Sequence, residues 1–178
     1  MNTPNKLTVF RFCMIPVVVA VLCLGQFDLL WLRIACSLFI VASLTDLLDG
    51  HLARKNNQIT NFGKFMDPLA DKTLVCAVLV ALIEWSLVPA WAVILILTRE
   101  FAISGVRLIA SERGVVLAAS RIAKFKTNVQ MIWVIALMLQ PGWSFWKAFT
   151  DVLMGASVLL TLVSFVDYLL RNKDILKD

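Results

Sequence analysis

The chain has 178 residues, of which 60% are hydrophobic and 16% are charged. Because charged residues make up about 25% of an ordinary soluble domain, this composition excludes that class and favours an integral membrane protein. The formal net charge of +5 suits anionic lipid headgroups or a phosphorylated substrate, and we expect no nucleic-acid partner.

Six apolar segments each come close to the ~20 residues that cross the ~30 Å hydrocarbon core of a bilayer. They cover residues 7–25, 31–52, 64–83, 87–109, 122–140 and 145–170. Gly, Pro, Asn and Asp residues lie at the connections, as is typical of breaks between helices. We therefore predict an all-α integral membrane protein with six transmembrane helices, which forms a single domain over residues 1–178.

The basic residues are distributed unevenly among the connections. If the N-terminus is cytoplasmic, all 17 Lys and Arg residues except Arg33 and Lys147 fall on the cytoplasmic side. A bias of this kind sets the orientation of a membrane protein, and an even number of spans agrees with it. We expect a multi-pass protein of the inner, or cytoplasmic, membrane, with both termini and the active site on the cytoplasmic side.

Four aspartates lie on the second and third predicted spans. Asp46 and Asp49 are three residues apart near the end of one span, and Asp67 and Asp71 are four apart at the start of the next. Each pair lies on one face of its helix, and the short connection makes the helices antiparallel neighbours, so the carboxylates can converge. Grouped carboxylates take up protons unless a cation lies between them, and their hard oxygen atoms suit Mg²⁺, Mn²⁺ or Ca²⁺. The sequence predicts one or two divalent cations.

The segment from Gly50 to Lys64 is expected to connect these two spans. Gly50 and Gly63 have no side chain, which permits close approach of a phosphate. Arg54 has a planar guanidinium that binds phosphate oxygen atoms in pairs. Together with the acids, these residues indicate a site for a metal-bound diphosphate.

The fourth and fifth spans carry further cations at their cytoplasmic ends, namely Arg99, Arg107, Lys124 and Lys126. Membrane anchoring is a competing explanation for the two arginines, and Glu100 could neutralise a neighbour. Since the two lysines would point about 200° apart on a regular helix, at least one of them could be only an anchor.

The acidic segment resembles the signature of the CDP-alcohol phosphatidyltransferase family. The matching positions are Asp46, Asp49, Gly50, Ala53, Arg54, Gly63, Asp67 and Asp71. Similarity to bacterial members that make phosphatidylglycerophosphate extends over nearly the whole chain, through residues 4–11, 98–101, 107 and 123–127. The resemblance implies a six-helix, homodimeric membrane enzyme that displaces CMP from a CDP-linked lipid with an alcohol, using two divalent cations, Mg²⁺ or Mn²⁺.

The resemblance also implies roles for particular residues. Asp46, Asp49 and Asp67 would bind both metals, and Asp71 would bind one metal and act as the general base. The residues expected to contact CDP-diacylglycerol are Asn5, Thr8, Gly50, Ala53, Arg54, Thr60 and Gly63. The expected acceptor is sn-glycerol 3-phosphate, because a phosphorylated acceptor gives a cluster of cations something to bind. The residues expected to bind it are Arg99, Arg107, Lys124 and Lys126. Membrane phospholipids would surround the protein.

Other interpretations stay open at this point. The same reaction could use an inositol phosphate or phosphatidylglycerol as the acceptor. A cation transporter also carries acids within its spans, although the glycines and Arg54 suit phosphate and no inverted repeat is visible. A membrane scaffold without chemistry would leave the four acids unexplained, even though the dipole at a helix N-terminus could account for Asp67 alone.

Overall fold

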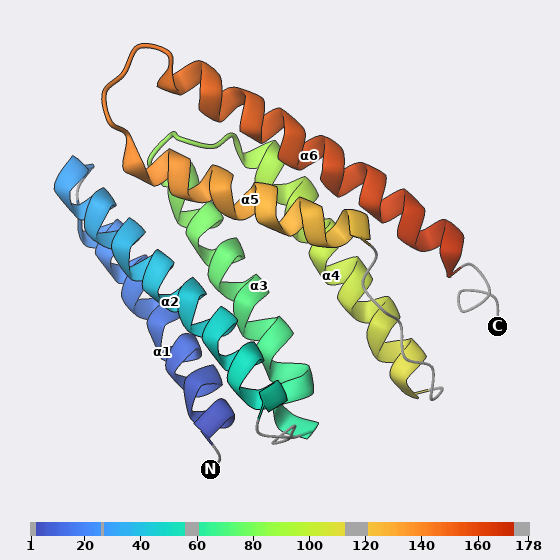
Figure 1. The fold of residues 1–178 in the computed structure, drawn as a ribbon. Helices are drawn as coiled ribbons and strands as arrows, with labels where there is room; N and C mark the ends of the chain where they lie inside the picture. Colours follow the sequence, from blue (N-terminus) through green and yellow to red (C-terminus); the bar gives the residue numbers. More distant parts are fainter. Residues whose placement is uncertain (1–2, 26, 56–60, 113–120, 173–178) are drawn as a thin grey trace. The chain divides into compact units, whose positions relative to one another are not determined.

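The computed structural model describes the backbone of residues 3–25, 27–55, 61–112 and 121–172, and the side chains of 8–25, 27–45, 66, 69–111 and 122–172. Its helices are α1 (Thr3–Leu24), α2 (Leu29–Lys55), α3 (Asn61–Glu84), α4 (Ala90–Glu112), α5 (Arg121–Leu139) and α6 (Trp146–Arg171) (Figure 1). Each of the six predicted segments corresponds to one of these helices, and the described residues contain no strand. The prediction of an all-α protein is confirmed.

Within the described residues, two helical stretches are both long and apolar enough to cross a membrane. They are Ile122–Leu139 in α5 and Trp146–Arg171, the whole of α6, while α1 and α2 contain the shorter apolar stretches Thr8–Leu24 and Leu29–Thr45. The chain is thus an all-helical protein whose apolar helices suit a membrane. The number of spans and their orientation stay predictions.

The two faces of α6 differ in a way that also suits a membrane. The exposed face carries large apolar side chains such as Val152, Leu159 and Leu170, whereas Ser164 and other hydroxyl residues are buried. A helix at the surface of a water-soluble protein has the opposite arrangement, with its polar side outward. The exterior of α6 is therefore better solvated by lipid than by water.

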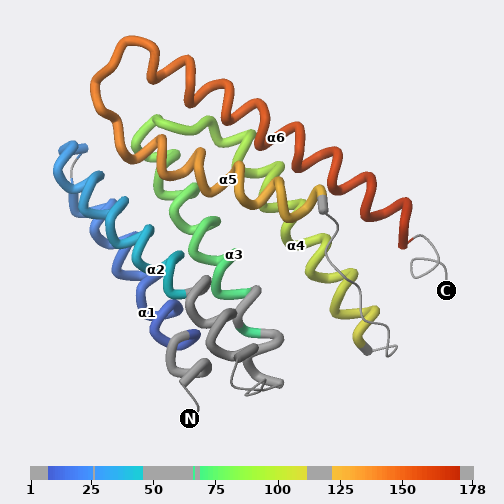
Figure 2. The backbone as a smooth tube through the Cα atoms, viewed as in Figure 1, coloured from blue at the N-terminus to red at the C-terminus, as the bar shows by residue number. Residues whose placement is uncertain are grey.

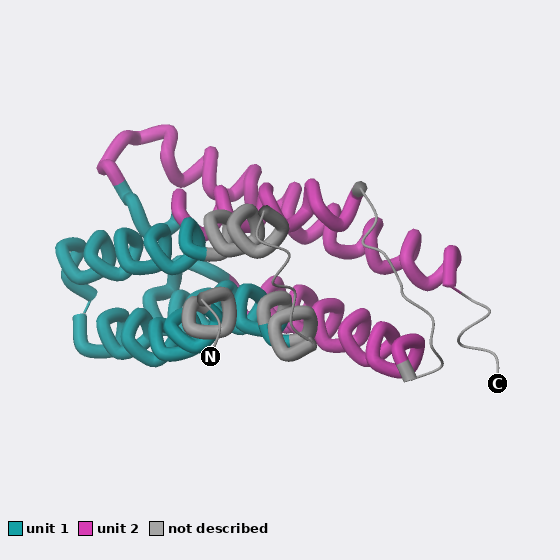
Figure 3. Tube along the Cα trace, turned by 60° about the horizontal axis from the view of Figure 1, so that its bottom comes forward, with its two compact units in different colours: residues 1–88, 137–140 teal, residues 89–136, 141–178 magenta. Residues whose placement is uncertain are grey.

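The chain divides into two compact units, each described here by itself (Figure 3). Unit 1 comprises residues 1–88 and 137–140, and unit 2 comprises residues 89–136 and 141–178. In unit 1, α1 packs against both α2 and α3, which also contact each other. In unit 2, α4 packs against α6 (Figure 2).

Aromatic contacts tie α1 to the C-terminal end of α3. The indole nitrogen of Trp85 donates a hydrogen bond of 3.1 Å to the carbonyl of Leu22, and the ring of Phe27 meets the Trp85 ring edge-on at 5.3 Å. Gly25 permits the turn into α2, because a Cβ atom there would lie 2.6 Å from the Cβ atom of Trp31. These contacts fix the end of unit 1 where α1 passes into α2.

One sequence-based boundary was wrong. The connection expected between Gly50 and Lys64 is shorter, because α2 continues to Lys55 and α3 begins at Asn61. Gly50, Ala53 and Arg54 therefore lie on α2, and Gly63 lies on α3. The expected limits followed the apolar composition, whereas a helix continues for as long as its backbone N–H groups bond the carbonyls four residues earlier, in polar sequence as well.

Candidate active site

The antiparallel order of α1, α2 and α3 brings the residues predicted in unit 1 to one end of that unit. Only residues 56–60 separate α2 from α3, so the C-terminal end of α2 lies beside the N-terminal end of α3, and α1 begins at the same end (Figure 1). The backbone of α2 carries Asp46 and Asp49 there, and α3 carries Asp67 and Asp71 in its first three turns. The sequence and the fold thus bring both acidic pairs to neighbouring helix ends.

Four carboxylates on two contacting helices are a donor set that fits divalent cations. Hard oxygen ligands suit Mg²⁺ and Mn²⁺, and close carboxylates need positive charge to remain ionised. The side chain of Asp71 is described and is half-buried. The side chains of Asp46, Asp49 and Asp67 lie outside the described residues, and among the side chains described, no group of three or more His, Cys, Asp or Glu lies together.

The residues predicted to contact CDP-diacylglycerol belong to the same three helices, with one exception. Asn5 and Thr8 lie in the first two turns of α1, where Thr8 is completely buried. Gly50, Ala53, Arg54 and Gly63 are placed by their backbones on α2 and α3. Thr60 lies outside the described residues, and so do the side chains of Asn5, Ala53 and Arg54.

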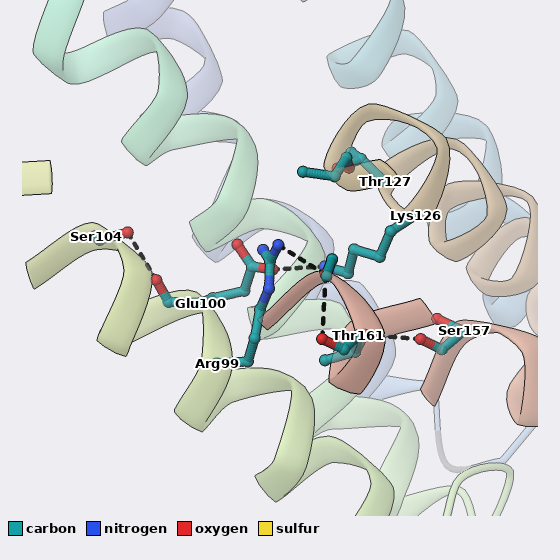
Figure 4. A network of polar contacts seen from close by, with 9 residues as sticks. Arg99, Glu100, Ser104, Lys126, Thr127, Ser157 and Thr161 are labelled. Carbon is teal, nitrogen blue, oxygen red and sulfur yellow. Dashed lines mark hydrogen bonds and ion pairs between the residues drawn. The ribbon is translucent and has the colours of Figure 1, made fainter. Parts of the chain in front are cut away.

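A buried ionic cluster in unit 2 contains two of the four cations predicted to bind the acceptor. The Nη1 atom of Arg99 lies 2.7 Å from Oε1 of Glu100, and Nζ of Lys126 lies 2.5 Å from the same oxygen. Arg99 and Glu100 are each 7% exposed and Lys126 is 2% exposed. Figure 4 shows the three side chains, which come from α4 and α5, meeting at Glu100. Glu100 thus pairs with its neighbour Arg99, as the sequence allowed, and also with Lys126.

The guanidinium of Arg99 is held at both terminal nitrogens. Nη1 donates to Glu100, and Nη2 donates to the hydroxyl of Ser164 on α6 at 2.9 Å. Its Nε is buried and has no hydrogen-bond partner among the residues described. An unsatisfied buried donor on a charged group costs free energy, which an anionic oxygen would recover. The Nε–H group of Arg99 is therefore a donor that no described residue uses and that an anion can bind.

Arg107 lies on α4, about two turns after Arg99, and has a different environment. Its guanidinium carbon lies 5.9 Å from the centre of the Tyr168 ring, within the range of a cation–π contact. The Nε atom of Arg107 and the hydroxyl of Tyr168 are both buried and lack a hydrogen-bond partner in the described part of the chain. A second arginine in unit 2 thus also presents a donor that no residue described here uses.

The two lysines predicted to bind the acceptor differ in burial, because residues two apart on a helix point in nearly opposite directions. Lys126 is buried in the ionic cluster, whereas Lys124 is exposed. Membrane anchoring therefore remains an adequate explanation for Lys124.

Sequence reasoning did not single out Ser164 and Tyr168, which contact the two arginines from α6. Ser157, Thr161, Ser164 and Tyr168 recur at intervals of four, three and four residues, which is the repeat of one helix face. All four are buried. This pattern of hydroxyl groups within an apolar segment is the signal that could have revealed them.

Comparison with known proteins agrees with the signature in α2 and α3. A sequence model of the CDP-alcohol phosphatidyltransferase family matches residues 1–163. The CDP-diacylglycerol–glycerol-3-phosphate 3-phosphatidyltransferase of Bacillus subtilis is 42% identical in an alignment covering 99% of this chain and 97% of the relative. The protein of the same name from Escherichia coli is 38% identical, covering 94% and 93%. A probable phosphatidylglycerophosphate synthase of Mycobacterium tuberculosis is 39% identical, covering 96% and 81%. The chain therefore belongs to the CDP-alcohol phosphatidyltransferase family.

Proposed function

We propose that this protein transfers the phosphatidyl group of CDP-diacylglycerol to a hydroxyl of sn-glycerol 3-phosphate, giving phosphatidylglycerophosphate and CMP. The observation that carries this proposal is the similarity, over nearly the full length of the chain, to relatives whose names state this reaction. The product belongs to phospholipid biosynthesis. The buried cations of unit 2 add support, since a phosphorylated acceptor brings the negative charge that they can bind.

In the proposed reaction, the acceptor hydroxyl oxygen forms a bond to the phosphorus that carries diacylglycerol. The bond from that phosphorus to the bridging oxygen breaks, and CMP leaves with this oxygen. The acceptor hydroxyl must lose its proton, and the carboxylate of Asp71 is the proposed base, because a carboxylate within hydrogen-bond reach can accept it.

Asp46, Asp49, Asp67 and Asp71 are the proposed ligands of two divalent cations, Mg²⁺ or Mn²⁺. When bound, the cations neutralise the diphosphate and make CMP a better leaving group. Asn5, Thr8, Gly50, Ala53, Arg54, Thr60 and Gly63 are the proposed contacts of CDP-diacylglycerol. Within this set, Arg54 would hold phosphate oxygen atoms through its planar fork, and the glycines would let them approach the backbone.

Arg99, Arg107, Lys124 and Lys126 are the proposed contacts of the acceptor phosphate. The buried Nε donors of Arg99 and Arg107, which no described residue accepts from, support the first two. Burial beside Arg99 supports Lys126. Lys124 is exposed, and its charge is the only property that supports this role.

We further propose that all six helices cross the inner membrane, with both termini and the active site on the cytoplasmic side. Residues 1–178 would act as one functional domain, because the family match at residues 1–163 includes parts of both compact units. A homodimer surrounded by membrane phospholipids is the proposed assembly.

The decisive experiment offers the purified full-length protein radiolabelled CDP-diacylglycerol and one acceptor at a time, with and without Mg²⁺ or Mn²⁺. We expect CMP release and phosphatidylglycerophosphate only with sn-glycerol 3-phosphate and a divalent cation. A lipid product formed instead with an inositol phosphate or phosphatidylglycerol would replace the proposed acceptor. Failure to release CMP with any acceptor would contradict the proposed reaction and reopen the cation-transporter interpretation.

A further inference from the structure

A stripe of buried hydroxyl groups runs along one face of α6. It consists of Ser157, Thr161, Ser164 and Tyr168, whose exposed fractions are 0%, 0%, 0% and 3%. Helix α6 as a whole is apolar enough to cross a membrane, and a buried hydroxyl group in such a helix is stabilised by polar contacts. Helix α4 packs against α6, and its two arginines contact Ser164 and the ring of Tyr168.

Ser164 is oriented so that it can only accept a hydrogen bond from Arg99. A serine hydroxyl has one proton, and Ser164 donates it to the carbonyl of Thr161 at 3.1 Å. Its lone pairs then face Nη2 of Arg99 at 2.9 Å. Since Glu100 accepts from Nη1, the plane of the guanidinium is fixed by two acceptors, and the Nε edge is the one left for an external anion.

Tyr168 holds the second arginine by a different contact. Four residues after Ser164 on the same face, its ring lies 5.9 Å from the guanidinium carbon of Arg107. Arg107 also keeps an unpartnered, buried Nε. Two successive hydroxyl residues of α6 therefore each contact one arginine of α4, and the buried Nε of each arginine has no hydrogen-bond partner in the described part of the chain.

We infer that Ser164 and Tyr168 are positioning residues, which hold Arg99 and Arg107 with their Nε atoms ready for the phosphate of the acceptor. The inference rests on the proposed function. Both residues follow residue 163, where the family match ends, so the shared signature does not assign them. On this view α6 sets the affinity for the acceptor in addition to anchoring the protein.

The test for Ser164 uses two matched variants of the full-length protein. Ser164→Ala removes the acceptor for Arg99, whereas Ser157→Ala removes an equally buried hydroxyl from the same helix that has no hydrogen-bond partner among the described residues. We expect Ser164→Ala to raise the KM for sn-glycerol 3-phosphate about tenfold, the factor equivalent to about 1.4 kcal/mol for a hydrogen bond to a charged group. Its KM for CDP-diacylglycerol and its kcat should stay within about twofold of the wild type, and Ser157→Ala should leave all three within about twofold.

The test for Tyr168 separates the ring from the hydroxyl. Tyr168→Phe keeps the ring over Arg107, and Tyr168→Leu removes it. We expect Phe to leave the acceptor KM within about twofold of the wild type and Leu to raise it at least about threefold, the factor for a partly buried cation–π contact. Equal KM values for the two variants would overturn the role of the ring.

A binding measurement makes the inference independent of turnover. Inorganic phosphate is added to the purified protein in detergent, and the melting temperature is recorded with and without it. We expect phosphate to raise the Tm of the wild type and of Ser157→Ala by similar amounts, and that of Ser164→Ala by less. A Ser164→Ala protein that melts earlier but keeps the wild-type phosphate shift and acceptor KM would reduce Ser164 to a purely structural role and overturn the inference.

The two proposals fail in different ways. Wild-type protein that makes no product from sn-glycerol 3-phosphate would contradict the proposed acceptor, while the phosphate shifts would still decide the role of Ser164. Wild-type protein that makes the product but whose acceptor KM is unaffected by Ser164→Ala would contradict only the inference.

Discussion

At the scale of single residues, the proposed metal ligands and the buried arginines differ in the charge expected to bind them. We propose that divalent cations bind Asp71 and the other three aspartates, because hard oxygen ligands suit such cations. Arg99 has a carboxylate already, but Glu100 shares one oxygen between Arg99 and Lys126. Burying two cations against one carboxylate is costly. We propose that a phosphate dianion of the acceptor binds beside this cluster.

Asp71→Asn tests the proposed general base. The amide is close in size to the carboxylate but cannot accept the proton of the acceptor hydroxyl, so we expect kcat to fall at least about 100-fold, the usual contribution of such a base. Binding of radiolabelled CDP-diacylglycerol should be largely retained. Asp151→Asn, which changes an exposed carboxylate on α6, is the matched control and should keep wild-type kcat. Full activity of Asp71→Asn would rule out its role as the base.

At the scale of helices, apolar composition was sufficient to predict all six elements but not their ends. The acidic motif lies where α2 and α3 leave apolar sequence, so the expected connection took in Gly50 and Gly63, which the structure assigns to helices. The spacing of the aspartates correctly indicated that each pair lies on a helix. A helical repeat is local, so it can be read directly from sequence.

The contacts of Arg99 could not have been derived in the same way. Ser164 lies 65 residues further along the chain, and Lys126 lies 26 residues beyond Glu100. Which face of α6 is buried depends on its packing against α4. The average hydropathy of an apolar segment does not reveal that four hydroxyl residues share that face. The sequence therefore predicted the charged residues, and only the fold placed neutral side chains of α6 beside them.

The repeat of α5 leads to a prediction about its two lysines. Lys126 is 2% exposed and paired with Glu100, whereas Lys124 is exposed on the same helix. Methionine keeps most of the length of a lysine side chain without the charge. We expect Lys126→Met to raise the acceptor KM at least about tenfold, because a buried charge contact of about 1.4 kcal/mol or more is lost. Lys124→Met should raise it only about twofold, because a contact made by an exposed charge is weak.

Steady-state kinetics with sn-glycerol 3-phosphate as the varied substrate would measure this difference. The KM for CDP-diacylglycerol serves as the internal control, because neither lysine is proposed to contact that substrate. Equal increases for the two variants would contradict the distinction drawn from burial.

At the scale of the whole molecule, the two groups of proposed site residues lie in different parts of the chain. The four aspartates of the signature lie at the adjoining ends of α2 and α3 in unit 1, and the buried pair Arg99 and Lys126 lies on α4 and α5 in unit 2. The family match at residues 1–163 includes all of them. A two-substrate transferase needs both kinds of site, one for a metal-bound diphosphate and one for an anionic acceptor. This need supports the view that the two units form one functional domain.

The proposed topology predicts that successive connections alternate between the two sides of the membrane. We would fuse green fluorescent protein or periplasmic alkaline phosphatase after Asp178, and insert the same reporters after Gly142 and between residues 113 and 120. Green fluorescent protein should be fluorescent, and phosphatase inactive, after Asp178 and within 113–120. Phosphatase should be active after Gly142, which is exposed in the connection between α5 and α6. Almost all Lys and Arg residues then lie on one side, as the positive-inside rule requires.

Active phosphatase after Asp178 would imply an odd number of spans if the N-terminus is cytoplasmic. In that case, the acids of α2 and α3 and the cations of α4 and α5 would need a different orientation from the one proposed.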